Sequence, residues 1–145
     1  IPKTNGRRSA LRFRIEKNDL FNLFKDPKIS VNEDFIFDGL EKDKDGIPCS
    51  AGHNSCAISC YGDVFPCIIL PLRLGNLREE SFSEIWRNSS LLPQLRSIRI
   101  RDLPKCSTCK LLTYCNRCPG LVYLEEGNIL GLSHRACEVA RIHKR

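Results

Sequence analysis

The sequence predicts a small, irregular α+β domain in which β-hairpins and short helices surround metal-bound cysteines. Three observations support this fold class. Nine cysteines occur in 145 residues, and four of them fall within residues 106–118. Residues 55–70 have the pattern of a hairpin, and two later segments begin with helix-capping residues. The apolar fraction of 41% permits a real but modest core.

The densest group of cysteines has the spacing C-x2-C-x5-C-x2-C, formed by Cys106, Cys109, Cys115 and Cys118. A C-x2-C pair lets two sulfur atoms reach one metal from a single turn, and both zinc and iron–sulfur sites use it. The other five cysteines lie on both sides of this group: Cys49, Cys56, Cys60, Cys67 and Cys137. We therefore expect the chain to fold around inorganic clusters that carry electrons.

The composition argues against several other classes of protein. The sequence has no apolar run long enough for a membrane span and no signal-peptide pattern, so we expect a cytoplasmic protein. The formal net charge is +6, but anionic clusters would offset part of it, and no pattern of basic and aromatic residues indicates nucleic-acid binding. The absence of methionine suggests that the chain is a fragment or a processed form.

The segment before the first cysteine is predicted to contain a strand and a helix. Apolar and basic residues alternate over 11–15, which indicates a half-buried strand. Asn18 is a candidate N-cap for a helix that ends before Pro27 and places Leu20, Phe21 and Phe24 on one face. A mildly apolar piece follows at 35–37. Residues 41–46 are predicted to form a solvated turn. No calcium site is assigned to their acidic side chains, because the EF-hand pattern is missing.

The register of the predicted hairpin favours one of its two inner cysteines as a metal ligand. Gly62 can adopt the positive φ of a bulge after a type I turn, and Ser59 then pairs with Asp63. This register places Cys56 beside Cys67 and leaves Cys60 at the turn. Cys56 is therefore preferred and Cys60 is the alternative, although a shift of one residue would reverse the choice.

The remaining elements are predicted from apolar spacing and turn residues. Residues 68–72 continue as buried chain, and 75–77 form a turn. Ser81 and Glu84 form a capping box for a helix with Trp86 in the core. A second short helix is predicted over 91–100. Its arginines are expected to form a solvated face, and the alternative places them near the charge of a cluster or at a partner surface. They are Arg96, Arg99 and Arg101.

The last part of the chain is predicted to contain a small hairpin and a helix. Residues 121–124 and 128–130 could pair across Gly127, and Ser133 could cap a helix that carries Cys137. The three histidines are expected in surface or capping roles rather than as ligands: His53, His134 and His143.

These spacings resemble the SPASM domain, the C-terminal auxiliary-cluster domain of many radical S-adenosylmethionine enzymes. Cys49-x12-Gly62-x4-Cys67 matches the first half of its pattern. The cysteines of 106–115 and the distant Cys137 match the second half. Two further segments also resemble the family's sequence: 74–77, Leu-Gly-Asn-Leu, and 84–86, Glu-Ile-Trp. The resemblance covers roughly residues 47–142.

The resemblance implies two [4Fe-4S] clusters with interleaved ligands and assigns no catalytic residue. The first cluster would be held by Cys49, Cys56, Cys67 and Cys118, with Cys60 as the alternative to Cys56. The second would be held by Cys106, Cys109, Cys115 and Cys137. The family commonly has C-x3-C where this chain has Cys115-x2-Cys118. In the family's three-ligand variant, the first cluster would keep an open iron.

The resemblance also implies partners that this sequence does not contain. Residues 1–46 would be a linker and the tail of a preceding radical S-adenosylmethionine barrel, and 47–145 the twin-cluster domain. Cys56-x3-Cys60 begins the C-x3-C-x2-C motif that cleaves S-adenosylmethionine, but Asp63 occupies the third position. S-adenosylmethionine and a third cluster would belong to the barrel, so whether the chain counts as an enzyme is left open. The family suggests electron transfer and substrate docking during peptide or protein modification, with a separate electron donor or acceptor.

Two other functions remain alternatives. A zinc-binding interaction module without a redox role would also use C-x2-C pairs, but zinc ribbons usually separate the pairs by about 15–20 residues. A disulfide-rich secreted protein is disfavoured by the odd number of cysteines and the missing signal.

Overall fold

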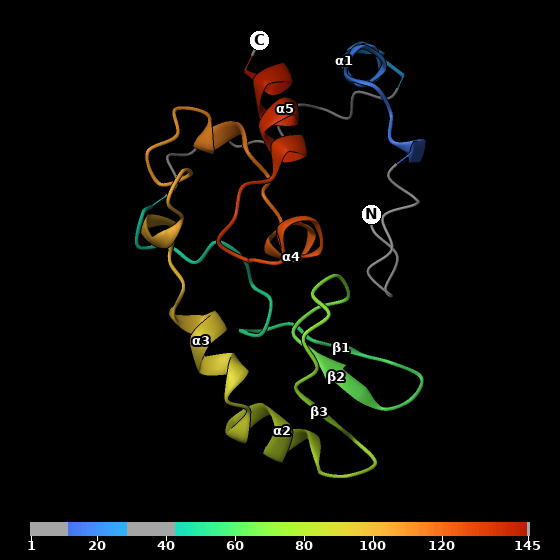
Figure 1. Cartoon of the computed structure of the whole chain (residues 1–145), viewed down its shortest axis with the longest axis vertical. Helices are drawn as coiled ribbons and strands as arrows, with labels where there is room; N and C mark the ends of the chain where they lie inside the picture. Colours follow the sequence, from blue (N-terminus) through green and yellow to red (C-terminus); the bar gives the residue numbers. More distant parts are fainter. Residues whose placement is uncertain (1–11, 29–42, 145) are drawn as a thin grey trace.

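The computed structural model describes residues 12–28 and 43–144, which form a small irregular α+β fold (Figure 1). This confirms the predicted fold class. The helices are α1 Lys17–Lys25, α2 Phe82–Asn88, α3 Leu91–Ser97, α4 Pro119–Glu126 and α5 His134–His143, with 3-10 turns η3 Ile100–Asp102 and η4 Leu112–Tyr114. The strands are β1 Ala57–Ile58, β2 Asp63–Phe65 and β3 Gly75–Asn76.

The three strands form one antiparallel sheet with β2 in the middle. Ala57 pairs with Phe65 in β1 and β2, which is the register predicted from the turn. Gly62 has φ +90°, and its N–H donates to the Ser59 carbonyl at 3.0 Å. The turn predicted at 75–77 is wrong in part, because Gly75 and Asn76 pair with β2 as a third strand.

Helices α2 and α3 lie beside the sheet, at the end of the molecule opposite α5 (Figure 1). The predicted capping box is confirmed, since the Ser81 side chain accepts from the N–H of Glu84 and the Glu84 side chain accepts from the N–H of Ser81. Trp86 is half-buried rather than fully in the core. Its ring stacks on Phe82 at 5.5 Å and lies under the Arg96 guanidinium at 4.9 Å.

Helix α4 replaces the predicted hairpin over residues 121–130, and that prediction was wrong. Pro119 occupies the first turn, where its missing N–H costs no helix bond, and Gly127 ends the helix with φ +72°. Both signals define a helix, and they outweigh the strand-like composition of 121–124. The helix lies between the sheet and α5 (Figure 1). Ser133 caps α5 as predicted, with its side chain accepting from the N–H of Ala136.

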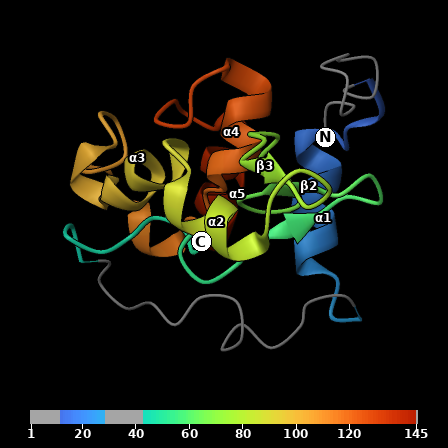
Figure 2. The same cartoon turned by 90° about the horizontal axis from the view of Figure 1, so that it is seen from below.

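The described N-terminal segment packs on α4 and α5 instead of forming a strand. Arg14 forms an ion pair with Glu125 of α4, and Arg135 of α5 donates to the Ile15 carbonyl at 2.9 Å. No strand is assigned within the described residues 12–16, because these contacts are made to helices. Helix α1 forms as predicted, but its N-cap is Glu16 rather than Asn18. Figure 2 shows α1 and α3 on opposite sides of α4 and α5.

The core is small and includes side chains of both the sheet and α5. Its fully or nearly fully buried apolar side chains come from most elements: Val64, Leu70, Ile85, Leu92, Ile100, Leu103, Val122 and Ala140. Ile68 is 91% exposed, so the expected buried run at 68–72 is confirmed only at Leu70. Leu11, residues 35–37 and the start of the 41–46 turn lie outside the described residues. In the described part, no helix is long and apolar enough to cross a membrane.

Candidate metal centres

The hairpin separates its two inner cysteines as the register predicts. Ala57 pairs with Phe65 at the end of the ladder, and continuing this register by one residue would set Cys56 opposite Pro66, next to Cys67. Cys60 lies in the turn, and both Cys56 and Cys60 are exposed. This geometry supports Cys56 over Cys60 as a partner of Cys67, and the choice stays a prediction.

The turn after Cys49 is held against the residue that precedes Cys67. The N–H of Gly52 donates to the carbonyls of Ser55 and Pro66, each at 3.1 Å. The Arg96 side chain donates to the Gly52 carbonyl at 2.8 Å, so this arginine is not simply part of a solvated face. Gly52 has φ +72°, and a Cβ there would lie 2.8 Å from Leu92. A glycine at this position therefore lets the Cys49 turn pack on Leu92, while its N–H bonds the carbonyl of Pro66, the residue before Cys67.

The start of α4 connects the hairpin to the cysteine-rich stretch 106–118. Cys118 is the N-cap of α4. A Cβ on Gly120 would lie 3.0 Å from the Ile69 side chain and 3.1 Å from the backbone nitrogen of Leu70. The helix start thus packs directly on the chain that follows Cys67. This contact supports the interleaved grouping in which Cys118 joins the hairpin cysteines.

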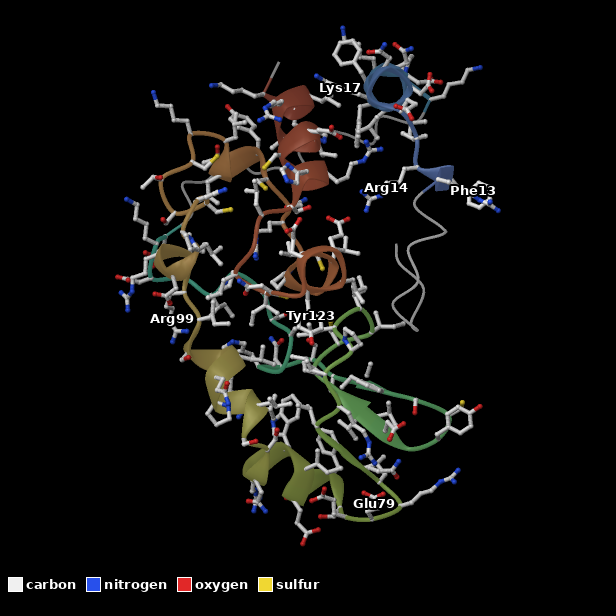
Figure 3. The ribbon with its side chains drawn as sticks, in the orientation of Figure 1. Phe13, Arg14, Lys17, Glu79, Arg99 and Tyr123 are labelled. Carbon is white, nitrogen blue, oxygen red and sulfur yellow. The ribbon has the colours of Figure 1, made fainter. Side chains whose placement is uncertain are left out.

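The cysteines predicted to bind the second cluster are more buried than those predicted to bind the first. Cys106 and Cys115 are buried, while Cys109 and Cys137 are half-buried. Helix α5 packs against η4, which lies between Cys109 and Cys115. Sulfur atoms gather around α4, α5 and the segment that precedes them (Figure 3).

The ionisation of Cys106 reflects this burial. Burial raises the pKa of the Cys106 thiol, and the Arg117 guanidinium opposes that shift. Negative charge on Cys137 and Cys109 raises the same pKa further. Cys106, Cys109 and Cys137 belong to one predicted ligand set, and that set stays a prediction.

Backbone N–H groups are directed at three of the cysteine sulfurs. Ala51 donates to Cys49 Sγ at 3.4 Å, Leu70 to Cys67 Sγ at 3.3 Å and Leu111 to Cys109 Sγ at 3.4 Å. Each donor lies two or three residues after its cysteine. Such bonds stabilise a thiolate, which is the form that binds iron. They occur in both predicted ligand sets, so the donor chemistry fits iron–sulfur clusters.

Arg117 is a residue of this site that sequence reasoning missed. It lies between Cys115 and Cys118, and its charge interacts with thiols of both predicted sets: Cys106, Cys115, Cys118 and Cys49. Burial lowers its pKa and these thiols raise it, yet a guanidinium stays charged at any physiological pH. Nothing in the sequence distinguishes this arginine from one on the surface.

The side chains do not converge on a single ion. Among the described residues, no three His, Cys, Asp or Glu side chains are close enough together to hold one metal ion. In a four-iron cluster each thiolate can bind a different iron, so its ligands stand further apart than ligands of one ion. All nine cysteines are free thiols, which gives no support to the disulfide alternative.

None of the histidines stands out as a ligand. His134 is exposed, and the His143 ring packs edge-on against Phe24 with the centroids 4.6 Å apart. His53 is half-buried, and burial together with Arg96 and Arg99 lowers its pKa.

Curated relatives share one name. An AdoMet-dependent heme synthase of Methanosarcina barkeri is 37% identical over 83 residues, which are 57% of this chain and 23% of that protein. The AdoMet-dependent heme synthase of Nitratidesulfovibrio vulgaris is 33% identical over 105 residues, which are 72% of this chain and 27% of that protein. The AdoMet-dependent heme synthase of Oleidesulfovibrio alaskensis is 40% identical over 70 residues, which are 48% of this chain and 18% of that protein.

The chain therefore spans only about a quarter of these relatives or less. No solved structure is a significant match. Residues 49–119 match the family model SPASM, described as an iron–sulfur cluster-binding domain. This segment contains every cysteine except Cys137. Through residues 49–119 the chain belongs to the SPASM family of iron–sulfur cluster-binding domains, which radical S-adenosylmethionine enzymes carry.

Proposed function

We propose that this chain holds two [4Fe-4S] clusters and relays electrons within a radical S-adenosylmethionine enzyme. Cys49, Cys56, Cys67 and Cys118 would hold the first cluster, and Cys106, Cys109, Cys115 and Cys137 the second. The observation that carries the proposal is the contact of Gly120 with the backbone at Leu70. It brings Cys118 toward the hairpin cysteines, so that one short loop serves two centres.

The chain's own residues would set the properties of such clusters. Bound clusters would supply one-electron carriers. The N–H groups of Ala51, Leu70 and Leu111 donate toward sulfur, and hydrogen bonds of this kind tune reduction potentials. Burial of Cys106 and Cys115 would limit the access of water to the second centre.

We further propose that the residues preceding Cys49 connect to a radical S-adenosylmethionine barrel. Residues 1–46 would be the linker and the barrel's last pieces, and 47–145 the cluster domain. The described part of this segment contacts α4 and α5 through Arg14 and the Ile15 carbonyl, which would couple the two units. Oxygen-sensitive clusters of this type suit the reducing cytoplasm.

Metal analysis tests the cluster proposal. Protein purified without oxygen should be brown and should contain about eight irons and eight sulfides per chain, if two four-iron clusters are bound. Colourless protein with one or two zinc ions would instead support the interaction module. In the full-length protein, the barrel's own cluster is to be removed by substitution of its cysteines before counting.

The hairpin ligand is tested by two matched substitutions. Cys56→Ala should lower the iron content of the first cluster, because Cys56 lies beside Cys67 in the sheet register. Cys60→Ala should leave the iron content unchanged, since Cys60 lies at the exposed turn. Iron loss in the Cys60 variant alone would reverse the assignment. Full iron in both variants would indicate a three-ligand cluster.

The substrate is proposed from the relatives' shared name. Because the three relatives are named heme synthases, we propose a heme precursor as the substrate of the full-length enzyme. Peptide or protein modification is the second candidate, suggested by the wider SPASM family. Anaerobic incubation of the full-length enzyme with S-adenosylmethionine, a reductant and tetrapyrrole heme precursors should yield heme by mass spectrometry. A mass change only in a co-encoded peptide would favour the second candidate.

A further inference from the structure

Arg117 occupies a place where a surface arginine would not be expected. Its side chain is half-buried and lines one cavity together with Cys49 and another together with Cys115. Its charge interacts with the thiols of four cysteines: Cys106, Cys115, Cys118 and Cys49. These four cysteines belong to both proposed ligand sets. Within the described residues no carboxylate forms an ion pair with this arginine. The thiols are therefore the negative groups that its charge meets.

Two of its three nitrogens are used by the backbone. Nε donates to the Gly131 carbonyl at 3.3 Å and Nη2 donates to the same oxygen at 2.8 Å. Nη2 also bonds the Ile129 carbonyl. These bonds fix the guanidinium between the cysteine loop and the segment that joins α4 to α5. The side chain is thus positioned firmly and is not free to turn toward solvent.

The third nitrogen, Nη1, has no hydrogen-bond partner among residues 12–28 and 43–144. It is fully buried. A guanidinium has five N–H donors, and a buried charged donor left without an acceptor is costly. Because the negative groups around it are cysteine sulfurs, a sulfur acceptor would satisfy this nitrogen. A bound cluster would supply such acceptors beyond the thiolates themselves.

We propose that Arg117 is a positioning residue that serves as the shared counter-charge of both clusters, with Nη1 donating to sulfur. This inference rests on the proposed function, since it requires both clusters. Adding one electron takes a four-cysteine cluster from about −2 to about −3 in net charge. A nearby cation stabilises the more negative state. Arg117 therefore raises both reduction potentials and lessens the repulsion between the two anionic centres.

Redox titration of the full-length protein tests the proposal, with dithionite as the reductant and paramagnetic resonance as the readout. Arg117→Gln removes the charge, while Arg117→Lys keeps the charge but cannot reproduce the forked bonds to the carbonyls. Arg101→Gln is the matched control, because Arg101 is an exposed arginine paired with Asp45. The barrel cluster is removed in every sample, so that only the two clusters of this chain are titrated.

The expected result is a lowered potential at both clusters in Arg117→Gln. We expect at least a tenfold change in each reduction equilibrium, about 59 mV for a one-electron couple. Arg117→Lys should change both potentials much less, and Arg101→Gln should change neither. If the Gln variant loses iron, retention of both clusters by the Lys variant supports the role of charge.

Three results would overturn the inference. The first is unchanged potentials in an iron-replete Arg117→Gln protein, and the second is a shift confined to one cluster. The third is an equal fall in potential, or an equal loss of iron, in the Lys and Gln variants. That third result would mean that only the hydrogen bonds to Gly131 and Ile129 matter. The native protein separates these failures from failure of the proposed function. If it lacks about eight irons, the two-cluster proposal itself is wrong.

Discussion

The two cysteine-bearing segments, 49–67 and 106–118, differ in how their backbones are held. The first is fixed by sheet pairing and by the turn of Gly52, whose N–H bonds the Pro66 carbonyl. The second has no strand and consists of tight turns closed by backbone hydrogen bonds. The N–H of Cys106 donates to the Leu103 carbonyl and the N–H of Cys109 to the Cys106 carbonyl, each at 3.0 Å.

The segments also differ in the exposure of their sulfurs. Cys56 and Cys60 of the first segment are exposed, whereas Cys106 and Cys115 of the second are buried. A strand ladder fixes its backbone without a ligand, but a loop with buried thiols depends on what those thiols bind. We infer that metal contributes more to the folding of 106–118 than to that of 49–67.

The largest effect should come from a buried cysteine of the second segment. Cys106→Ala should remove at least half of the iron, because it would delete one proposed ligand of a cluster whose loop is proposed to serve the other centre as well. It should also broaden the thermal unfolding transition. Cys60→Ala, the same change at an exposed thiol, should alter neither property. Equal iron in the two variants, measured by chemical analysis, would contradict the contrast between the segments.

A smaller effect is expected at Gly52, where the first segment approaches Leu92 of α3. Gly52 and Gly127 both have φ +72°, but only at Gly52 would a Cβ meet a neighbour, Leu92, at 2.8 Å. Gly127→Ala should therefore cost only the backbone strain, about 1–2 kcal/mol. Gly52→Ala should cost that amount plus roughly 1–3 kcal/mol of overpacking. Thermal unfolding of both variants measures the difference, and equal destabilisation would rule out the close approach.

The smallest effect concerns the carboxylate that links β2 to β3. Hydrogen bonds from Asn76 and Arg73 lower the pKa of Asp63. A lowered folded-state pKa means that the stabilisation is present above the unfolded value of about 3.9 and is lost as pH falls through the folded value. Asp63→Asn should thus be less stable than the native chain at neutral pH.

The difference in stability between these two proteins should narrow as the pH falls below about 4, because the unfolded chain binds the proton first. It should be smallest once the native carboxyl is protonated at its lower pKa. Unfolding midpoints compared with those of Glu79→Gln provide the control, because Glu79 contacts the same arginine at 3.4 Å but is more exposed. A gap that stays constant with pH would show that ionisation of Asp63 is not involved.

Some elements could be predicted because a few neighbouring residues define them. Gly62 fixed the turn and, with it, the pairing of Ser59 with Asp63. Ser81 and Glu84 defined the start of α2, and Ser133 the start of α5. Other elements depended on distant contacts. Residues 12–15 alternate basic and apolar side chains, yet they form no strand and instead contact α4 and α5 through Arg14 and the Ile15 carbonyl.

By itself the sequence determined the cysteine spacing, the hairpin register and the family, because each depends on residues close together in the chain or on their order. The tertiary structure decided which cysteines are buried and that Cys118 approaches the chain after Cys67. It also decided that Arg117 lies among thiols from both segments. Those features arise from packing between residues more than forty positions apart, such as Leu70 and Gly120, and local spacing carries no information about them.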